Sequence, residues 1–279
     1  MVNVGAVIQA RSNSTRLKNK VLLPLPFNGT KTILNHIIDR ISLCNEIKKI
    51  IIATTTNVED DIIEKISVAD GVDIFRGSEN NVLERFYLAA KKFNIDIIVR
   101  LTADNPFIDP SFVTDVLYKH INMKADYTGS DGLPLGMNIE VISFGALEKA
   151  FFDAKKPYEL EHVTPYIYKR IDAFKIQTVN FDVSPILSDL RFTIDYPSDY
   201  AFSSLIFDKI YEINNCFGLP EIELLFIEFP WLKEISSSNY QKKSFKSIHE
   251  EFETAIECLN KMDLKNASSL LDRFYHETK

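Results

Sequence analysis

A dense group of basic and hydroxyl side chains follows the first apolar run of this chain. Residues 9–20 place Arg11, Arg16 and Lys20 among small polar residues such as Ser14. Arginine offers phosphate oxygens a planar fork of donors, and lysine offers them a mobile charge. The glycine patterns of P-loops and dinucleotide-binding turns are missing. The segment therefore predicts either a small phosphate-bearing ligand or an exposed basic loop that binds nothing.

Two aspartates stand where later apolar runs end. Asp104 follows the run at residues 96–101, and Asp195 follows the run at 191–194. Carboxylates at such positions can hold Mg²⁺, a hard ion that takes few protein oxygens together with phosphate oxygens. Taken alone, Asp104 is better read as an Asx turn before proline. Asp199 is assigned to a favourable first turn of a helix. Facing the basic loop, Asp104 and Asp195 would make a magnesium–phosphate site.

His162 allows both a structural and a functional interpretation, and Ser78 is expected to have a structural role. His162 follows Glu161 in a helical stretch and could bind or protonate a ligand, but a lone histidine is more often structural. Ser78 follows the run at residues 72–75 and is expected to cap a helix.

The elements that must position these residues alternate along the chain. Continuously apolar runs at residues 4–8, 50–53, 72–75 and 96–101 are typical of buried parallel strands. Between them, helical spacing is expected in the segments 33–41, 57–66 (capped by Asn57) and 79–93. Further helices are expected at 110–120, 158–170 and 197–214, and further strands at 138–142, 174–179 and 191–194. This alternation predicts a three-layer α/β fold with a mainly parallel sheet.

The pattern changes near residue 231. We expect one domain over residues 1–230 and a helical C-terminal extension over residues 231–279. Residues 236–239 are a plausible linker, and residues 245–258 and 264–274 are amphipathic. Those two helices would pack on the domain or mediate a homodimer.

Composition excludes several classes of protein. The net charge is −7, from 32 basic and 39 acidic residues, which argues against a nucleic-acid partner. Residues 1–38 nevertheless hold five basic residues and no acidic one, which suits a small anion. No apolar run reaches the about 18 residues of a spanning helix, so we expect no membrane partner. The 3 cysteines are far apart, and the start lacks a signal-peptide pattern, so a cytoplasmic location is expected.

Taken in order, five motifs resemble the cytidylyltransferase family. The similarity is greatest to its spore-coat polysaccharide biosynthesis protein F-like branch and more distant to CMP-Kdo and CMP-sialate synthetases. The resemblance runs from about residue 4 to about residue 213. The motifs are Q-A-R-x-x-S-T-R-L-x-x-K, F-R-G-S-E-x-x-V-L-x-R, V-R-x-T-x-D-x-P-x-I-D-P, E-H-V-T-P-Y-I and L-R-x-T-x-D-x-P-x-D.

The resemblance implies a nucleotide-diphospho-sugar transferase (Rossmann-like) fold and an enzyme that uses CTP and Mg²⁺. It would move CMP to a sugar acid or sugar phosphate, for surface polysaccharide or glycan biosynthesis. The positions assigned to catalysis are Arg11, Lys20 and Asp104. The implied nucleotide-binding positions are Ala10, Arg11, Ser14, Arg16, Lys20, Arg76, Arg100, Thr102 and Asp104. The implied acceptor-binding positions are Asn138, Glu140, Glu161 and His162, and the implied metal ligands are Asp104 and Asp195.

The sequence also departs from the family pattern. Lys18 and Asn19 replace a usual Pro–Gly pair, so the backbone of this loop can follow a different path from that of the family. Ala103 and Asn105 flank Asp104 where the family has Gly and Cys, and Asn138 replaces an aspartate. We interpret these changes as altered geometry or substrate choice, because every charged phosphate and metal position is retained.

Two other functions remain open at this point. A glycosyltransferase of the same fold class would bind a finished nucleotide sugar and release no pyrophosphate, although the first motif argues against it. A non-catalytic nucleotide-binding protein would bind CTP without turnover. The identity of the acceptor is also open, because fold similarity does not identify substrates.

Overall fold

The computed structural model describes residues 2–237 and 247–277. The chain divides into two compact units, Met1–Asn239 and Tyr240–Lys279. Because α10 (Leu232–Ser237) contacts α8 (Pro197–Ile210), the first unit includes helical residues beyond position 230.

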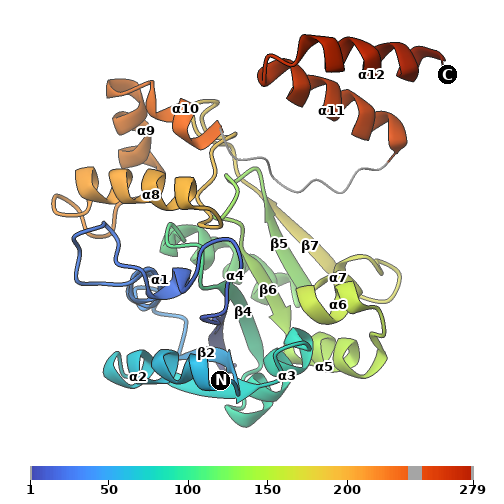
Figure 1. Ribbon diagram of the computed structural model, residues 1–279. Coiled ribbons are helices and arrows are strands. Elements are labelled where there is room, and N and C mark those ends of the chain that lie inside the picture. Colours follow the sequence, from blue (N-terminus) through green and yellow to red (C-terminus); the bar gives the residue numbers. More distant parts are fainter. Residues whose placement is uncertain (1, 238–246, 278–279) are drawn as a thin grey trace. The chain divides into compact units, whose positions relative to one another are not determined.

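A seven-stranded sheet forms the centre of the first unit (Figure 1). Its strand order is β3-β2-β1-β4-β6-β5-β7. β6 runs antiparallel to both of its neighbours, and the other neighbouring pairs are parallel. The expected mainly parallel sheet is therefore confirmed. The strands are β1 (Val4–Gln9), β2 (Lys49–Thr55), β3 (Asp73–Gly77), β4 (Ile97–Thr102), β5 (Tyr127–Asp131), β6 (Glu140–Ser143) and β7 (Ile176–Asn180).

The register of the central strands aligns their carboxyl ends. Gln9, the last residue of β1, lies opposite Thr102, the last residue of β4, and opposite Ala53 of β2. Loops that leave β1 and β4 therefore begin side by side. In open α/β sheets this edge is where ligands bind.

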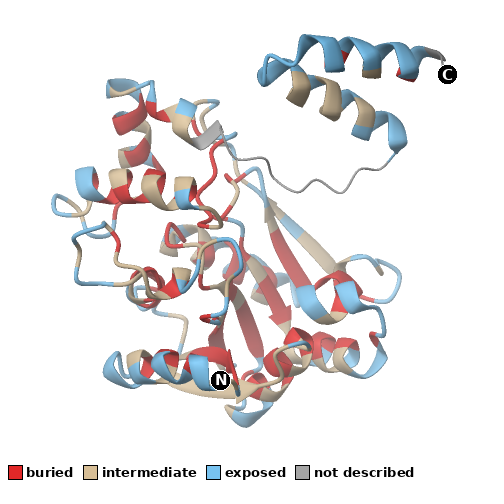
Figure 2. Ribbon diagram, viewed as in Figure 1, coloured by how far each residue is buried: buried red, intermediate tan, exposed pale blue. Residues whose placement is uncertain are grey.

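Helices cover both faces of the sheet (Figure 2). Side chains alternate across a strand, so Ala6 and Ile8 of β1 join one apolar cluster and Val7 joins the other. The first cluster includes residues of α1, α4, α8 and α9, and the second includes residues of α3, α5 and α7. The helices of this unit are α1 (Ile33–Ile41), α2 (Asp61–Ala69), α3 (Val82–Lys92), α4 (Pro110–Met123), α5 (Phe144–Asp153), α6 (Pro157–His162), α7 (Pro165–Tyr168), α8, α9 (Leu219–Glu228) and α10, with 3₁₀ turns at Lys20–Leu22 and Val58–Asp60.

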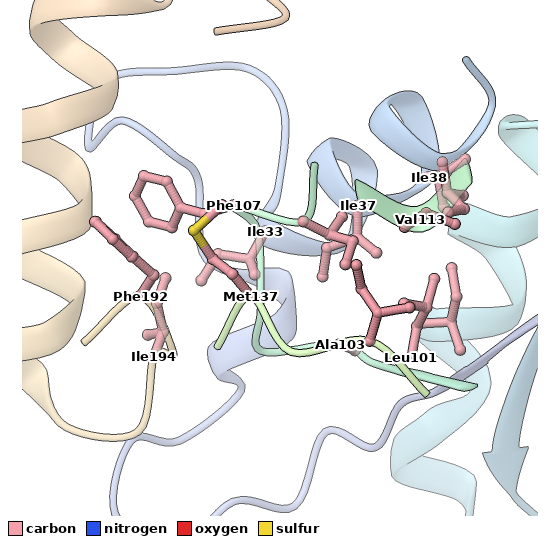
Figure 3. Packing of buried hydrophobic residues seen from close by; sticks show 14 of the residues in the cluster. Ile33, Ile37, Ile38, Leu101, Ala103, Phe107, Val113, Met137, Phe192 and Ile194 are labelled. Carbon is pink, nitrogen blue, oxygen red and sulfur yellow. The ribbon is translucent and has the colours of Figure 1, made fainter. Parts of the chain in front are cut away.

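The first cluster reaches the carboxyl edge of the sheet. Figure 3 shows Ala103 and Leu101 near the end of β4, with Met137, Phe192 and Ile194 on neighbouring segments. The rings of Phe107 and Phe192 are 4.8 Å apart. This packing fixes the segment that carries residues 192–194 against the segment that follows β4.

Several local expectations were wrong. The residues at 191–194 form no strand, because only an isolated bridge joins Leu135 to Arg191. The expected helix at 158–170 is broken into α6 and α7 at Val163, whose φ is 70°. Asn81, not Ser78, caps α3 with its side chain. Asn57 makes no side-chain cap. Sequence periodicity also missed β5, α5, α9 and α10.

The second unit is a pair of helices, α11 (Ile248–Lys261) and α12 (Lys265–Glu277). The hydroxyl of Ser247 accepts a 3.2 Å hydrogen bond from the amide of Glu250 and so caps α11. The rings of Phe252 and Tyr275 stack with 5.6 Å between centroids. Two amphipathic helices were expected here. The expected linker residues 238–239 and the start of the first helix at 245–246 lie outside the described residues.

No helix within residues 2–237 and 247–277 is long and apolar enough to cross a membrane.

Candidate active site

A cavity of about 620 Å³ opens at the carboxyl edge of the sheet. This volume is in the range of small-molecule sites. Residues that leave β1, β3 and β4 line it, together with residues of α3 and α6 and Asp195. The predicted site residues among its lining are Ala10, Arg11, Ser14, Arg16, Lys20, Thr102, Asp104, Glu161, His162 and Asp195.

The basic loop after β1 is held by a buried aspartate. Asp60 Oδ1 accepts hydrogen bonds of 2.7 Å from both the amide and the hydroxyl of Ser12. Its other oxygen accepts a hydrogen bond from Thr55 at the end of β2. Burial alone raises the pKa of Asp60, but the bonds from Thr55 and Ser12 hold the pKa below its ordinary value. The ionised carboxylate thus fixes the start of the loop.

The far end of the loop turns back through Asn19. The amide of Asn19 donates a 3.2 Å hydrogen bond to the carbonyl of Ser12. Asn19 has φ 53°, in the left-handed region that glycine and asparagine reach most readily. Asn19 stands where the resemblance implies a glycine, and asparagine is suited to the same conformation. The 3₁₀ turn that begins at Lys20 follows directly.

Lys20 lies between two carboxylates from distant parts of the chain. Its ammonium Nζ is 2.7 Å from Asp104 Oδ2 and 3.0 Å from Asp195 Oδ1. Burial by itself lowers the pKa of Lys20, but the two carboxylates raise it above its ordinary value. Burial by itself raises the pKa of Asp104, and the ammonium of Lys20 brings it below its ordinary value. Lys20 and Asp104 are therefore both charged at neutral pH.

Backbone hydrogen bonds set the position of Asp195. The amide of Ile194 donates to the carbonyl of Asp104, at 2.8 Å. Asp199 Oδ2 accepts from the amides of Asp195 and Tyr196, at 2.9 and 3.0 Å, and so begins α8. The expectation that Asp199 stabilises the start of a helix is confirmed. Gly136 allows the segment around Thr193 to lie close to it. A Cβ at position 136 would lie only 2.5 Å from the amide nitrogen of Thr193.

Two arginines add positive charge to the cavity. Arg16 Nη2 is 2.8 Å from Asp195 Oδ1, and its guanidinium lies over the ring of Tyr196 at 4.8 Å. Arg11 is more exposed, and its Nη1 is 4.0 Å from Glu79 Oε1. Both side chains are therefore free to reorient toward an anion more readily than Lys20.

Helix α6 forms the opposite wall. Glu161 and His162 are exposed at the end of this helix, and both line the cavity. The ring of His162 is 4.6 Å from the ring of Tyr158. The break at Val163 ends α6 and leaves these two side chains at the cavity.

Four predicted site residues do not line the cavity. Arg76 donates instead to Asp61, Glu64 and the carbonyls of Thr55 and Asn57, at 2.6 to 2.9 Å. These bonds engage all three guanidinium nitrogens with the protein. The structure therefore separates Arg76 from the other predicted nucleotide-binding residues.

Arg100 and Glu140 pair with each other, and neither lines the cavity. Arg100 Nη1 is 2.5 Å from Glu140 Oε2, and Glu140 Oε1 accepts a 2.8 Å hydrogen bond from Tyr127. Arg100 Nη2 also lies 3.4 Å from the Oε1 of Gln9, which does line the cavity. Asn138, the fourth such residue, is exposed.

Sequence reasoning missed other lining residues. Glu79, Asn80, Val82 and Arg85 follow β3 and lie within a quoted motif, but only Arg76 of that motif was assigned to the site. Asp60, which holds the basic loop without lining the cavity, was also missed because it lies in no motif. Its only local signal was its place shortly after the run of threonines that ends β2.

The two aspartates fit a magnesium ion by their chemistry. Asp104 and Asp195 bring oxygen donors to the same point, as their shared contact with Lys20 shows. Mg²⁺ is commonly bound by one or two carboxylates with waters and phosphate oxygens. Across the described ranges there is no cluster of three or more His, Cys, Asp or Glu suited to a metal.

The sequence is similar to proteins of one family. The cytidylyltransferase family matches residues 6–251. An uncharacterized protein of Methanocaldococcus jannaschii is 37% identical over 255 residues, which is 89% of this chain and 100% of that protein. The spore coat polysaccharide biosynthesis protein SpsF of Bacillus subtilis is 34% identical over 211 residues, 75% of this chain and 88% of that protein.

A solved structure agrees with these matches. A cytidylyltransferase from Leptospira borgpetersenii has a TM-score of 0.76 and 30% identity, covering 87% of this chain and 100% of that one. The family match ends at residue 251, so the resemblance extends further than the motifs, which ended near residue 213, had indicated.

Proposed function

The chain belongs to the cytidylyltransferase family, and we propose that it transfers CMP from CTP to a sugar acid or a sugar phosphate, releasing pyrophosphate. The observation that carries the proposal is the convergence of Lys20, Asp104 and Asp195 on one cavity at the carboxyl edge of the sheet. Arg11 and Arg16 extend the positive charge along the same cavity.

In this reaction the acceptor oxygen attacks the α-phosphorus of CTP, and the bond to the β-phosphate breaks. Lys20 and Arg16 would bind the departing pyrophosphate and compensate its charge. Arg11, which has the more exposed side chain, would close onto the phosphates. Positioning and fixed charges contribute most of the rate in such reactions, because the protein itself forms no covalent bond.

Asp104 and Asp195 would hold Mg²⁺, which supplies a positive charge next to the phosphates when it is bound. Their contact with Lys20 must loosen for this to happen, so Lys20 would pass from the carboxylates to phosphate oxygens. The loop fixed by Asp60 limits that movement to the lysine side chain.

The acceptor would meet the wall formed by α6. Glu161 and His162 are exposed there and can offer hydrogen bonds to sugar hydroxyls. A sugar acceptor is supported by the similarity to a protein named for spore coat polysaccharide biosynthesis. Glu140 and Arg100 would act from outside the cavity wall, through the network that reaches Gln9. Asn138 is exposed and does not line the cavity.

Pyrophosphate release tests the proposal. The full chain is incubated with Mg²⁺, each of the four NTPs in turn, and a panel of sugar acids and sugar phosphates. We expect release with CTP and one acceptor, loss of release with EDTA, and recovery with added Mg²⁺. Asp104→Asn should abolish release, whereas Asp208→Asn, on the exposed side of α8, should retain it. Binding of CTP without release from any pair would instead support a non-catalytic nucleotide-binding protein.

A further inference from the structure

The guanidinium of Arg191 lies against the carboxylate of Asp195, outside the cavity. Arg191 is 8% exposed and is not among the residues that line the cavity. Its Nη2 is 3.7 Å from Asp195 Oδ2. Arg16 and Lys20, which both line the cavity, contact Oδ1 of the same carboxylate at 2.8 and 3.0 Å. The two oxygens of Asp195 therefore have different surroundings: Oδ1 meets the side chains of the cavity, and Oδ2 meets a buried cation.

Asp199 balances the charge of Arg191. This aspartate is 2% exposed, and its Oδ1 and Oδ2 are 3.4 and 3.5 Å from Nε and Nη2 of Arg191. Its Oδ2 also accepts the hydrogen bonds from the amides of Asp195 and Tyr196. Removing one partner of a buried ion pair leaves the other charge uncompensated, so such a pair holds its place. Arg191 and Asp199 therefore form a fixed pair, and the carboxylate of this pair also fixes the backbone of Asp195.

The backbone that follows Arg191 is tied to two other segments. The amide of Phe192 donates a 2.7 Å hydrogen bond to the carbonyl of Leu135. The amide of Ile194 donates a 2.8 Å hydrogen bond to the carbonyl of Asp104. Both Phe192 and Ile194 are fully buried in the apolar cluster at this edge of the sheet. We therefore expect Arg191 to keep its place when the contents of the cavity change.

On this basis, which rests on the proposed function, we propose that Arg191 is a positioning residue that holds Oδ2 of Asp195 and leaves only Oδ1 for a metal ion. Ca²⁺ takes about six to eight oxygen ligands and often binds both oxygens of one carboxylate. Mg²⁺ requires a near-octahedral arrangement and takes few protein oxygens, together with waters and phosphate oxygens. A carboxylate with one oxygen already engaged suits Mg²⁺ and withholds a ligand from Ca²⁺. Arg191 thereby favours Mg²⁺ over Ca²⁺ at this site.

The test is calorimetric binding of CTP to the full chain in an excess of Mg²⁺ or of Ca²⁺, without acceptor, so that turnover does not interfere. We expect the unaltered protein to bind CTP more tightly with Mg²⁺ than with Ca²⁺. In Arg191→Met, Asp195 is free to offer both oxygens and is less firmly oriented, so the ratio of the two affinities should fall about tenfold. Arg170→Met is the matched control and should leave the ratio unchanged, because Arg170 pairs with Glu159 and neither residue lines the cavity.

A double variant keeps the test valid if Arg191→Met does not fold. Arg191→Met combined with Asp199→Asn removes both charges of the buried pair, which costs less than removing one of them. The asparagine oxygen can still accept from the amides of Asp195 and Tyr196. We expect the same fall in the ratio of affinities in this variant.

Three results would overturn the inference: an unchanged ratio in the folded variants, equal weakening of CTP binding with both ions, or equal binding with both ions in the unaltered protein. In each of these cases CTP is still bound, and the proposed function stands. If the unaltered protein binds no CTP with either ion, the proposed function fails together with this inference.

Discussion

The amide of Ile194 donates a 2.8 Å hydrogen bond to the carbonyl of Asp104. This bond joins two segments that are about ninety residues apart and places Asp195 next to the carboxyl end of β4. The side chain of Ile194 is fully buried in the same apolar cluster as Ala103 (Figure 3). The magnesium-binding pair proposed here is therefore assembled by a backbone contact supported by apolar packing.

Replacing Lys20 should remove most of the activity. Lys20→Met leaves Asp104 and Asp195 without their shared ammonium. It also removes one of the positive charges that we propose to bind the departing pyrophosphate. We expect kcat for pyrophosphate release to fall about 10²- to 10³-fold, the range for loss of one preorganised charge. Lys31→Met is the matched control, because Lys31 pairs with Asp39 at an exposed position. Retention of more than half the activity by Lys20→Met would contradict the assignment.

Replacing Asp60 should loosen the loop without touching a ligand. Asp60→Asn substitutes an amide for a buried carboxylate that accepts three hydrogen bonds from Ser12 and Thr55. We expect the free energy of unfolding to fall by about 1–3 kcal/mol and the KM for CTP to rise. Glu59→Gln changes the neighbouring, exposed carboxylate and should alter neither quantity. Chemical denaturation and steady-state kinetics measure the two effects, and a normal KM in Asp60→Asn would contradict the positioning role.

Because Asn19 has a left-handed backbone conformation, the effect of replacing it should depend on the residue that is introduced. Asn19→Gly should keep the stability and the KM for CTP, because glycine adopts φ 53° without strain. Asn19→Ala should lower the free energy of unfolding by about 1 kcal/mol, since Cβ disfavours this region. Lys18→Ala controls for loss of a loop side chain. Equal stability of the glycine and alanine variants, measured by urea unfolding, would show that the loop changes its path.

Two buried histidines predict a loss of stability in weak acid. Burial lowers the pKa of both His36 and His120 to about 4. The unfolded chain binds protons near pH 6.5 and the folded chain does not, so stability is present above pH 6.5 and lost as the pH falls toward 4. We expect a loss of about 2 kcal/mol per histidine between pH 6.5 and 5.

Glutamine variants isolate this effect. His36→Gln removes the titrating group and can still donate to the carbonyl of Leu25, which His36 Nε2 contacts at 2.6 Å. The slope of unfolding free energy against pH should become shallower in His36→Gln and in His120→Gln. It should not change in His276→Gln, whose side chain is exposed. If the unaltered protein and the three variants show parallel slopes, the two histidines are not the source of the loss of stability in weak acid.

The fold was largely predictable because its signals are local. Buried parallel strands are continuously apolar, and β1 to β4 each lie where such a run was found. Short elements without that signal were missed. The residues of β5 contain Thr, Gly and Ser and so lack an apolar run, although the sheet buries three of the five residues. The segment at 191–194 had the composition of a strand but pairs only through one isolated bridge.

The sequence by itself determined which residue types are available to the site: the basic loop after β1, Asp104 after β4, Asp195, and the order of the family motifs. Only the tertiary structure decided which of these groups meet. Lys20 and Asp195 are 175 positions apart, and their contact depends on how distant segments pack. The alternation of side chains along β4 places Arg100 beside Glu140 of β6. Helix α3 places Arg85 at the cavity. Residue type and strand periodicity can be read from a short stretch of sequence, whereas the partner of a side chain depends on packing between segments that are remote in sequence.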